Sequence, residues 1–241
     1  LQDVLQEKLN QMNERQREAV EHTEGPLLIL AGAGSGKTTV LINRIAYMLS
    51  KGICKPYEIL AITFTNKAAT ELKERLEKML GEEAKEIWAS TFHSSCVRIL
   101  RRDGQVLGYT KSFTIYDTDD TKRLIKECQR QLGISDANLP HKTILNEISH
   151  AKDSLVSPDD YIASAGKDAR KAQIGKVYKM YQKELKNADA MDFDDIIVNT
   201  VKLLEEYDDV REYYQKKFRY IMVDEYQDTN HAQYKLTELL A

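Results

Sequence analysis

Short apolar runs alternate with longer amphipathic stretches in the first part of the chain and again near its end. Buried strands are predicted at four of these runs, residues 27–30, 59–63, 87–91 and 219–223. The stretches between them carry apolar residues at helical spacing, which predicts helices over 38–50 and 67–80, and another that follows FHSS and reaches about 101. Strands that alternate with helices indicate parallel βαβ units, so the predicted fold class is α/β with a parallel sheet.

The pattern changes in the middle of the chain. A short strand is predicted at 113–116, and nearly everything from 118 to 187 is charged, amphipathic and helical in pattern. The alternation of strand and helix patterns resumes after this stretch. We therefore predict an α/β core, residues 1–105 and 190–241, that is interrupted by a helical insertion subdomain at 106–189.

Two local signals fit this organisation. Asn13 stands where a helix cap is expected, directly before the amphipathic stretch that begins at Glu14. Tyr178, Tyr181 and Leu185 fall on one stripe of a predicted helix, which indicates a buried face in the helical insertion.

Composition and charge narrow the class of protein. Of the 241 residues, 42% are hydrophobic and 30% are charged, as in globular proteins that bury a core. The net charge of −3 excludes a basic footprint over the whole surface, so any nucleic-acid site must be a local groove. No apolar run approaches the ~20 residues that span a bilayer, and no signal peptide is visible, so we expect a cytoplasmic protein without a membrane partner.

The cysteines are also consistent with a cytoplasmic protein. Cys54, Cys96 and Cys128 are far apart and odd in number, which disfavours both a disulfide framework and a metal site. We predict that they are reduced residues of the core.

The strongest motif is AGAGSGKTT, which follows the first apolar run. It matches G-x-x-x-x-G-K-[ST] except at the first position, where Ala31 replaces glycine. Small residues let successive backbone N–H groups close around phosphate oxygens, and a helix N-terminus adds positive potential. Lys37 would reach the β- and γ-phosphates of ATP, and the Thr38 hydroxyl would bind Mg²⁺. The candidate nucleotide-binding residues are Ala31, Gly32, Ala33, Gly34, Ser35, Gly36, Lys37, Thr38 and Thr39. A flexible loop beside a buried strand is the alternative, and the strand before and helix after the motif disfavour it.

The second motif is YIMVDEYQD, an apolar strand that delivers two adjacent acids. Asp224 would bind Mg²⁺ directly or through water, and Glu225 would orient and deprotonate the attacking water. On its own, an acidic pair after a strand is more often a solvated turn. Downstream of a phosphate-binding motif in an α/β pattern, we interpret it as the second half of an ATP-hydrolysing site.

Hydroxyl, amide and aromatic groups stand where two further strands end, in TFTN at 63–66 and TFHS at 91–94. Such groups suit phosphate contacts and base stacking for single-stranded nucleic acid, at the edge where open α/β sheets bind ligands. Taken alone, Phe64 is more often a core residue, and His93 is as often structural as functional.

These stretches resemble the N-terminal part of superfamily 1 DNA helicases of the UvrD/PcrA/Rep type. The matching strings are MNERQREAV, AGAGSGKTT, LAITFTNKAATEL, TFHS, MDFDD and VDEYQDTN, and they cover almost all of the predicted core. The long VDEYQDTN and TFTNKAA strings separate this group from other P-loop ATPases. A nuclease-associated relative of the RecB or AddA kind is a less close alternative. The resemblance implies a RecA-like P-loop NTPase fold.

The resemblance also implies roles for matching positions. Gln16 would read the adenine edge, for which its amide offers one donor and one acceptor. Gln227 and Asp228 would couple the nucleotide site to the DNA side. Gln227 is also counted as catalytic, together with Lys37, Asp224 and Glu225. Single-stranded DNA contacts are implied for Thr63, Phe64, Thr65, Asn66, Thr91, Phe92, His93, Ser94, Asp192 and Phe193. Thr39 departs from the pattern, because many relatives carry an arginine near the nucleotide there.

The chain is expected to be a piece of a longer protein. It begins at Leu1, and its last residues, 239–241, continue a helical pattern without a stop signal. The family pattern continues with a second motor domain, whose two arginines reach the γ-phosphate. An arginine finger is worth ~10³ to 10⁵ in turnover, so the chain alone is expected to bind Mg-ATP weakly and hydrolyse it very slowly. The family's next strand, which would lie beside the acidic strand, is also missing, so exposed sheet edges and aggregation or domain swapping are expected.

The predicted function of the parent is ATP-driven movement along single-stranded DNA, as in a 3′-to-5′ helicase of repair or replication, with single-strand/duplex junctions as substrates. A bacterial, nucleoid-associated location is implied. A nucleotide-dependent switch or scaffold without motor activity is the alternative of a different class, and aromatic-bearing strand ends argue against it. A metabolic kinase would need an acceptor pocket, for which no signature is seen.

Overall fold

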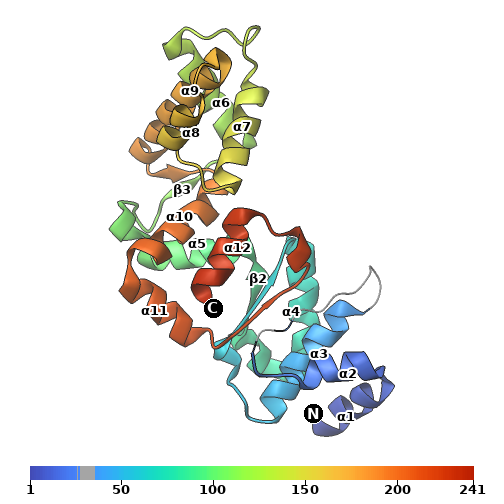
Figure 1. Cartoon of the computed structure of the whole chain (residues 1–241). Helices are drawn as coiled ribbons and strands as arrows, with labels where there is room; N and C mark the ends of the chain where they lie inside the picture. The colour runs from blue at the N-terminus through green and yellow to red at the C-terminus, as the bar shows by residue number, and fades with distance from the viewer. Residues whose placement is uncertain (26, 28–35) are drawn as a thin grey trace. The chain divides into compact units, whose positions relative to one another are not determined.

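The computed structural model describes residues 1–25, 27 and 36–241 (Figure 1). The predicted strand at 27–30, apart from Leu27, and the motif residues 31–35 lie outside the described residues. The described chain divides into two compact units. The first comprises Leu1–Ser95, Tyr213–Asp228 and Ala241, and the second comprises Cys96–Glu212 and Thr229–Leu240. The subdomain limits predicted at 106 and 189 remain a prediction.

A parallel sheet forms the centre of the first unit. Its described strands are β1 (Ile59–Thr63), β2 (Trp88–Thr91) and β5 (Tyr220–Val223), in the order β2-β1-β5. Both neighbours pair with β1 in parallel, Leu60 lying opposite Trp88 on one side and Ile221 on the other. All five residues of β1 are buried, which explains its continuous apolar run. The predicted α/β class with a parallel sheet is confirmed.

Helices and short 3₁₀ turns complete the first unit. They are α1 (Gln2–Gln11), α2 (Glu14–Glu21), α3 (Lys37–Ser50) and α4 (Asn66–Leu80), with 3₁₀ turns η1 (Pro56–Glu58), η2 (Gly81–Glu86) and η4 (Tyr226–Asp228). Asn13 caps α2 as predicted, and its side chain accepts a hydrogen bond from the backbone of Gln16. The Thr65 side chain caps α4 in the same way.

Apolar faces of α3 and α4 pack with the sheet in one core. Ile45 and Met48 of α3, Leu72 and Leu76 of α4, and Ile59 of β1 belong to this buried cluster. On β2, Trp88 contacts Phe218 edge to face, with ring centroids 4.8 Å apart. The charged outer faces of these helices need no partner, because only their apolar stripes are buried.

The second unit is mainly helical. Its elements are α6 (Thr118–Leu132), α7 (His141–Asp153), α8 (Pro158–Ser164), α9 (Ala169–Asn187), α10 (Phe193–Glu206), α12 (His231–Leu240) and the 3₁₀ turn η3 (Gly104–Leu107). The division between the units falls within α5 (Phe92–Asp103) and α11 (Asp208–Lys217). Tyr178, Tyr181 and Leu185 are buried in one cluster with residues of α6 and α7, as their spacing predicted.

A two-stranded parallel ladder also belongs to the second unit. It joins β3 (Thr114–Ile115) to β4 (Ala190–Met191), with Ile115 opposite Met191. The sequence predicted a strand at 113–116 and none at Ala190–Met191. In the structure, α10 begins only at Phe193, after Asp192 has capped it.

The cysteines behave as predicted. Cys54, Cys96 and Cys128 are all free and buried. Burial raises the pKa of the Cys54 and Cys128 thiols to about 11, which keeps both protonated near neutral pH. Across the described ranges, no helix combines the length and apolar character that a membrane span requires.

The central position of β1 generates a stability prediction. We expect Leu60→Ala to lower the free energy of unfolding by about 2–5 kcal/mol, because a fully buried side chain is removed from a strand that is covered on both faces. Urea unfolding followed by circular dichroism measures the change. Val4→Ala, at an exposed position of α1, is the matched control and should change it by less than about 0.5 kcal/mol. Equal effects of the two substitutions would contradict the placement of β1.

Candidate nucleotide and nucleic-acid site

The N-terminus of α3 carries the described end of the phosphate-binding motif. Gly36 has φ +83°, a left-handed conformation that glycine adopts without strain, and α3 begins at the next residue. The Lys37 ammonium lies 3.3 Å from the Glu225 Oε2 atom. The structure therefore brings Lys37 together with one of the two acids predicted at the end of β5.

The acidic pair is held by the sheet. The Asp224 backbone N–H donates to the Ile62 carbonyl at 2.9 Å, which extends the pairing of β5 with β1 beyond Val223. The Glu225 N–H donates to Asp224 Oδ1 at 3.0 Å, and the side-chain amide of Gln227 donates to the Glu225 carboxylate. Glu225 itself has φ +55°, an uncommon conformation for a residue with a side chain. The turn thus aims one carboxylate at Lys37.

Asp224 and Thr38, the two predicted metal ligands, also meet. The Thr38 hydroxyl lies close enough to the Asp224 carboxyl to lower its pKa, although other effects on this group are larger. Burial, and then the neighbouring charge of Glu225, raise the pKa of Asp224 above its ordinary value. A hydroxyl and a carboxylate are the oxygen donors that Mg²⁺ prefers, and Mg²⁺ commonly completes its shell with water and substrate phosphate. The donor set therefore fits this cation, although no cluster of three or more His, Cys, Asp or Glu residues occurs in the part of the chain that the structure covers.

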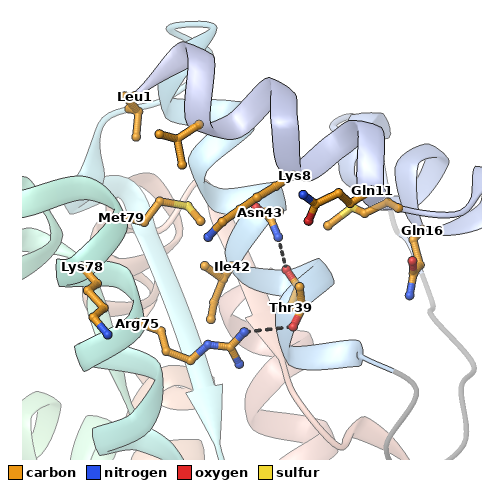
Figure 2. A pocket seen from close by; sticks show the side chains of 12 residues that line it. Leu1, Lys8, Gln11, Gln16, Thr39, Ile42, Asn43, Arg75, Lys78 and Met79 are labelled. Atoms are coloured by element: carbon orange, nitrogen blue, oxygen red, sulfur yellow. Dashed lines mark hydrogen bonds between the residues drawn. The ribbon is translucent and has the colours of Figure 1, made fainter.

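A pocket of about 690 Å³ lies beside the start of α3 (Figure 2). Its lining residues come from α1 and the residues that flank it, from α3 and α4, and from Gln16 of α2. The Gln16 Oε1 atom accepts a hydrogen bond from the Asn13 N–H at 3.1 Å. Its Nε2 atom is 3.5 Å from where a Cβ on Gly36 would stand. The residue expected to read adenine thus lies next to the phosphate-binding motif and faces the same pocket as Thr39.

Arg75 and Asn43 are pocket residues that sequence reasoning missed. The Arg75 guanidinium donates to the Thr39 Oγ1 atom at 2.9 Å, so an arginine of α4 reaches the position at which the family arginine is replaced by threonine (Figure 2). Asn43 donates to the Thr39 carbonyl at 2.8 Å and is only 1% exposed. Its Oδ1 atom is buried and has no hydrogen-bond partner among the residues described.

The predicted nucleic-acid residues at the ends of β1 and β2 lie side by side. Thr63 is opposite Thr91 in the parallel register, and both are buried. Phe64 packs edge to face on the buried Phe92, with ring centroids 5.4 Å apart. Phe64 itself is half-buried, so part of the ring remains accessible for stacking.

The polar residues at the ends of β1 and β2 also form hydrogen bonds with near neighbours in the chain. Thr91 Oγ1 accepts from the Ser94 backbone N–H at 3.1 Å and donates to the Ser94 hydroxyl at 3.1 Å. Ser94, Thr65 and Asn66 are exposed, whereas His93 is half-buried. Exposed hydroxyl and amide groups therefore follow the ends of two neighbouring strands, as Phe64 does.

Asp192 and Phe193 belong to the second unit. Phe193 is 59% exposed, whereas Asp192 is only 5% exposed. One oxygen of Asp192 lies 2.6 Å from the Lys152 ammonium and accepts from the Tyr181 hydroxyl at 2.8 Å. The sequence did not predict this role for Lys152, although its spacing from Ile144 and Ile148 places it on the buried stripe of α7.

Two findings now define the class of protein. A parallel sheet delivers an acidic pair to the N-terminus of a helix, and the lysine and threonine of a phosphate-binding motif contact those acids. This is the arrangement of an α/β nucleoside-triphosphate-binding protein. The chain belongs to the UvrD/REP helicase family, because the family model "UvrD/REP helicase N-terminal domain" matches residues 12–241. The predicted family and its RecA-like fold are confirmed.

Curated relatives agree with the family model. The chain is 52% identical over 233 residues to the "ATP-dependent DNA helicase PcrA" of Staphylococcus aureus strain NCTC 8325, a match that covers 97% of this chain and 32% of the relative. It is 52% identical over 230 residues to the protein of the same name from Staphylococcus epidermidis strain ATCC 12228, covering 95% and 31%. The chain thus spans about a third of the length of these relatives.

The acids at the start of α10 generate a pH prediction. Burial, and then the charge of Asp192, raise the pKa of Asp194 to about 6 from an ordinary value of 3.8. A carboxyl group whose pKa is higher in the folded state destabilises that state once it ionises, so the cost is absent below pH ~3.8 and complete above pH ~6. Each pKa unit corresponds to ~1.4 kcal/mol, which partial exposure reduces. We expect Asp194→Asn to raise the free energy of unfolding by about 1–2 kcal/mol at pH 8.

Urea titrations of both proteins from pH 4 to pH 8 test this expectation. The difference should shrink steadily as the pH falls from 8 to 4, since the wild-type carboxyl is then neutral in the folded state and partly protonated in the unfolded state. Asp159→Asn, which removes an exposed acid of α8, is the control. A difference between wild type and Asp194→Asn that is independent of pH would contradict the raised pKa.

Proposed function

We propose that this chain is the ATP-binding part of a motor protein that moves along single-stranded DNA and unwinds duplexes. The observation that carries the proposal is the pairing of Lys37 with Glu225, next to which Thr38 lies near Asp224. The family match and the printed names of the PcrA relatives support both the ATP and the DNA component. Repair or replication, 3′-to-5′ movement and a place at the nucleoid of a bacterial cytoplasm follow from the resemblance.

Each side chain near the phosphates of ATP would have its own role. The γ-phosphate of ATP would replace Glu225 as the partner of Lys37, since a phosphate carries more negative charge than a carboxylate. Glu225 would then be released to orient and deprotonate the attacking water. Thr38 and Asp224 would hold Mg²⁺, which when bound neutralises charge on the phosphates. Gln227, which already contacts Glu225, would transmit the state of this carboxylate toward the DNA side.

The adenosine end would occupy the pocket beside α3. Gln16 lines this pocket and Gly36 lies next to it, so a nucleotide with its phosphates at the motif can extend its base toward Gln16. Arg75 adds a guanidinium that donates to Thr39 in the same lining. These groups support binding of a base and a sugar, which carry both donors and acceptors.

The nucleic-acid track would run over the ends of β1 and β2. Phe64 offers a ring face for base stacking, and Phe92 supports it from beneath. Exposed Thr65, Asn66 and Ser94 would contact phosphate and sugar oxygens, as polar side chains do in most nucleic-acid complexes. Thr63, Thr91 and His93 would complete this edge. In the second unit, the exposed ring of Phe193 would provide a further stacking surface, next to the predicted contact Asp192.

Full motor activity would need the rest of the protein. The chain spans about a third of the PcrA relatives, and the resemblance assigns the catalytic arginines to a second motor domain. We propose that ATP binding closes the two motor domains on DNA and that hydrolysis reopens them. The 241-residue chain on its own would therefore bind ATP and hydrolyse it very slowly.

Two substitutions separate nucleotide binding from hydrolysis. Lys37→Ala should weaken binding of a fluorescent ATP analogue at least tenfold, because the phosphates lose a charged partner. Glu225→Gln should leave binding equal or tighter, because it frees Lys37, and should slow hydrolysis about 10²- to 10⁴-fold. Analogue titration and release of radiolabelled phosphate measure the two quantities.

Lys51→Ala is the matched control for charge loss, because Lys51 is an exposed cation at the opposite end of α3. It should leave the affinity for the analogue unchanged. Unchanged binding by Lys37→Ala would overturn the nucleotide site. Rapid, DNA-stimulated turnover by the wild-type chain would overturn the assignment of the missing arginines.

A substitution at the sheet edge tests the DNA track. Phe64→Ala should weaken binding of a fluorescein-labelled oligo-dT about 5- to 100-fold, because stacking on an aromatic ring is worth ~1–3 kcal/mol per base. Fluorescence anisotropy measures the affinity, and unfolding curves check that the protein remains folded. Tyr57→Ala removes an exposed ring elsewhere in the first unit and should have no effect. Equal affinities of wild type and Phe64→Ala would count against this track.

Experiments on the parent protein distinguish a motor from a nucleotide-dependent switch without motor activity. A switch would bind DNA differently with and without an ATP analogue and yet show no strand separation. The parent with its second motor domain should displace a labelled strand from a duplex with a 3′ single-stranded tail when ATP is present. Failure of this displacement, with nucleotide-dependent DNA binding retained, would favour the switch.

A further inference from the structure

A buried lysine lies between two carboxylates at the start of α10. The Lys152 ammonium is 2.6 Å from Asp192 Oδ2 and 2.9 Å from Asp195 Oδ1. Lys152 is 2% exposed and Asp195 is 1% exposed, so water does not screen these contacts. The Tyr181 ring lies beneath the ammonium, with its centroid 5.0 Å away.

Every carboxylate oxygen of this cluster has a partner. Asp192 Oδ1 accepts from the Asp195 N–H at 2.8 Å, and Asp192 Oδ2 accepts from Lys152 and from the Tyr181 hydroxyl. Asp195 Oδ2 accepts from the Asp192 N–H at 3.0 Å, and Asp195 Oδ1 accepts from Gln182 at 2.8 Å. The cluster therefore ties α7 and α9 to the residue that caps α10.

Burying these charged groups costs free energy that apolar residues at the same positions would not cost. Burial by itself would lower the pKa of Lys152, but the charges of Asp195 and Asp192 outweigh burial and raise it. Burial would likewise raise the pKa of Asp192, yet the neighbouring ammonium lowers it. Burial raises the pKa of Asp195 to about 6, so all three groups are charged only near neutral pH and above. Replacing such a buried ion cluster by apolar residues is often neutral or stabilising. What the ions provide here is a defined geometry at the cap.

That geometry determines where Phe193 lies. Asp192 is the N-cap of α10, and the capping box with Asp195 sets the backbone path into the helix. Phe193 is the first residue of α10, directly after the cap, and it is 59% exposed. The cap therefore fixes the backbone from which the Phe193 side chain projects.

We propose that Lys152 is a positioning residue for DNA binding: through Asp192 and Asp195 it fixes the α10 cap and so holds the Phe193 ring where a base of single-stranded DNA stacks. This rests on the proposed function, which assigns stacking to Phe193. Lys152 does not contact the nucleic acid, since its ammonium is buried and engaged by two carboxylates. Asp192 acts with it, because its oxygens are all engaged inside the protein.

A double-mutant cycle tests this coupling in the 241-residue chain. Affinity for an oligo-dT is measured by anisotropy for wild type, Lys152→Met, Phe193→Ala and the double variant. Phe193→Ala should weaken binding about 5- to 100-fold. Lys152→Met should weaken it less, by about 3- to 10-fold, because a displaced ring still stacks part of the time. In the Phe193→Ala background, Lys152→Met should change the affinity by less than about twofold, since the ring through which it acts is gone.

The salt dependence supplies a second readout. A lysine that contacts a DNA phosphate contributes ~1 to the slope of log affinity against log salt concentration, and its removal lowers that slope. Lys152→Met should leave the slope unchanged while lowering the affinity. Lys179→Met is the matched control, because it removes an exposed lysine of α9 that is paired with Asp159 at 2.9 Å. It should not reproduce the coupling to Phe193.

A milder variant covers the case in which Lys152→Met fails to fold. Tyr181→Phe removes only the hydroxyl that donates to Asp192 and keeps the buried ring. It should weaken binding about twofold or more in the wild-type background and have no further effect in Phe193→Ala. Unfolding curves confirm that each variant remains folded during the titrations.

The outcomes separate the two proposals. If Phe193→Ala binds DNA as wild type does, the stacking role of Phe193 fails, and the role of Lys152 fails with it. If Phe193→Ala weakens binding but Lys152→Met and Tyr181→Phe act additively with it, only the positioning role is overturned. Non-additive losses with an unchanged salt slope support it.

Discussion

The parallel pairing of β1 with β5 is the contact on which the first unit depends. It joins segments from opposite ends of the chain, and its last hydrogen bond, from Asp224 to the Ile62 carbonyl, sets the point at which the acidic pair leaves the sheet. Because parallel strands end at the same edge, the pairing also places the Thr63–Phe64 end of β1 at that edge. The nucleotide residues and the proposed DNA track are therefore two consequences of one strand register.

Much of this arrangement could be predicted from sequence because it depends on local pattern. A parallel strand that is covered on both faces reads as a continuous apolar run, and ILAIT at β1 is such a run. The position of a residue relative to a strand end is also local information, which is why Asp224, Glu225 and Phe64 were recognised. β4 was not, because its two residues have no pattern of their own and form a strand only when β3 lies beside them.

The charged residues of the site were harder to predict. A lysine in a charged amphipathic helix reads as solvated, and the Asp192 partner of Lys152 lies 40 residues further along the chain. Only its place on the stripe of Ile144 and Ile148 distinguishes it from exposed lysines. Arg75 likewise reads as a solvated residue of α4, and its contact with Thr39 depends on how α3 and α4 pack. Long polar side chains have too many possible partners for spacing to select one.

The left-handed backbone of Glu225 has a consequence for which substitutions this position tolerates. A conformation with φ +55° costs a residue with a side chain about 1–2 kcal/mol. The turn offsets this cost through hydrogen bonds in which the Glu225 N–H donates to Asp224 and the Glu225 carbonyl accepts from the Asp228 N–H. Glycine or asparagine would satisfy the backbone but remove the carboxylate, whereas a β-branched residue would satisfy neither requirement. Glutamate is thus retained against its own conformational preference. A sequence library selected for stability alone should therefore move away from glutamate at this position.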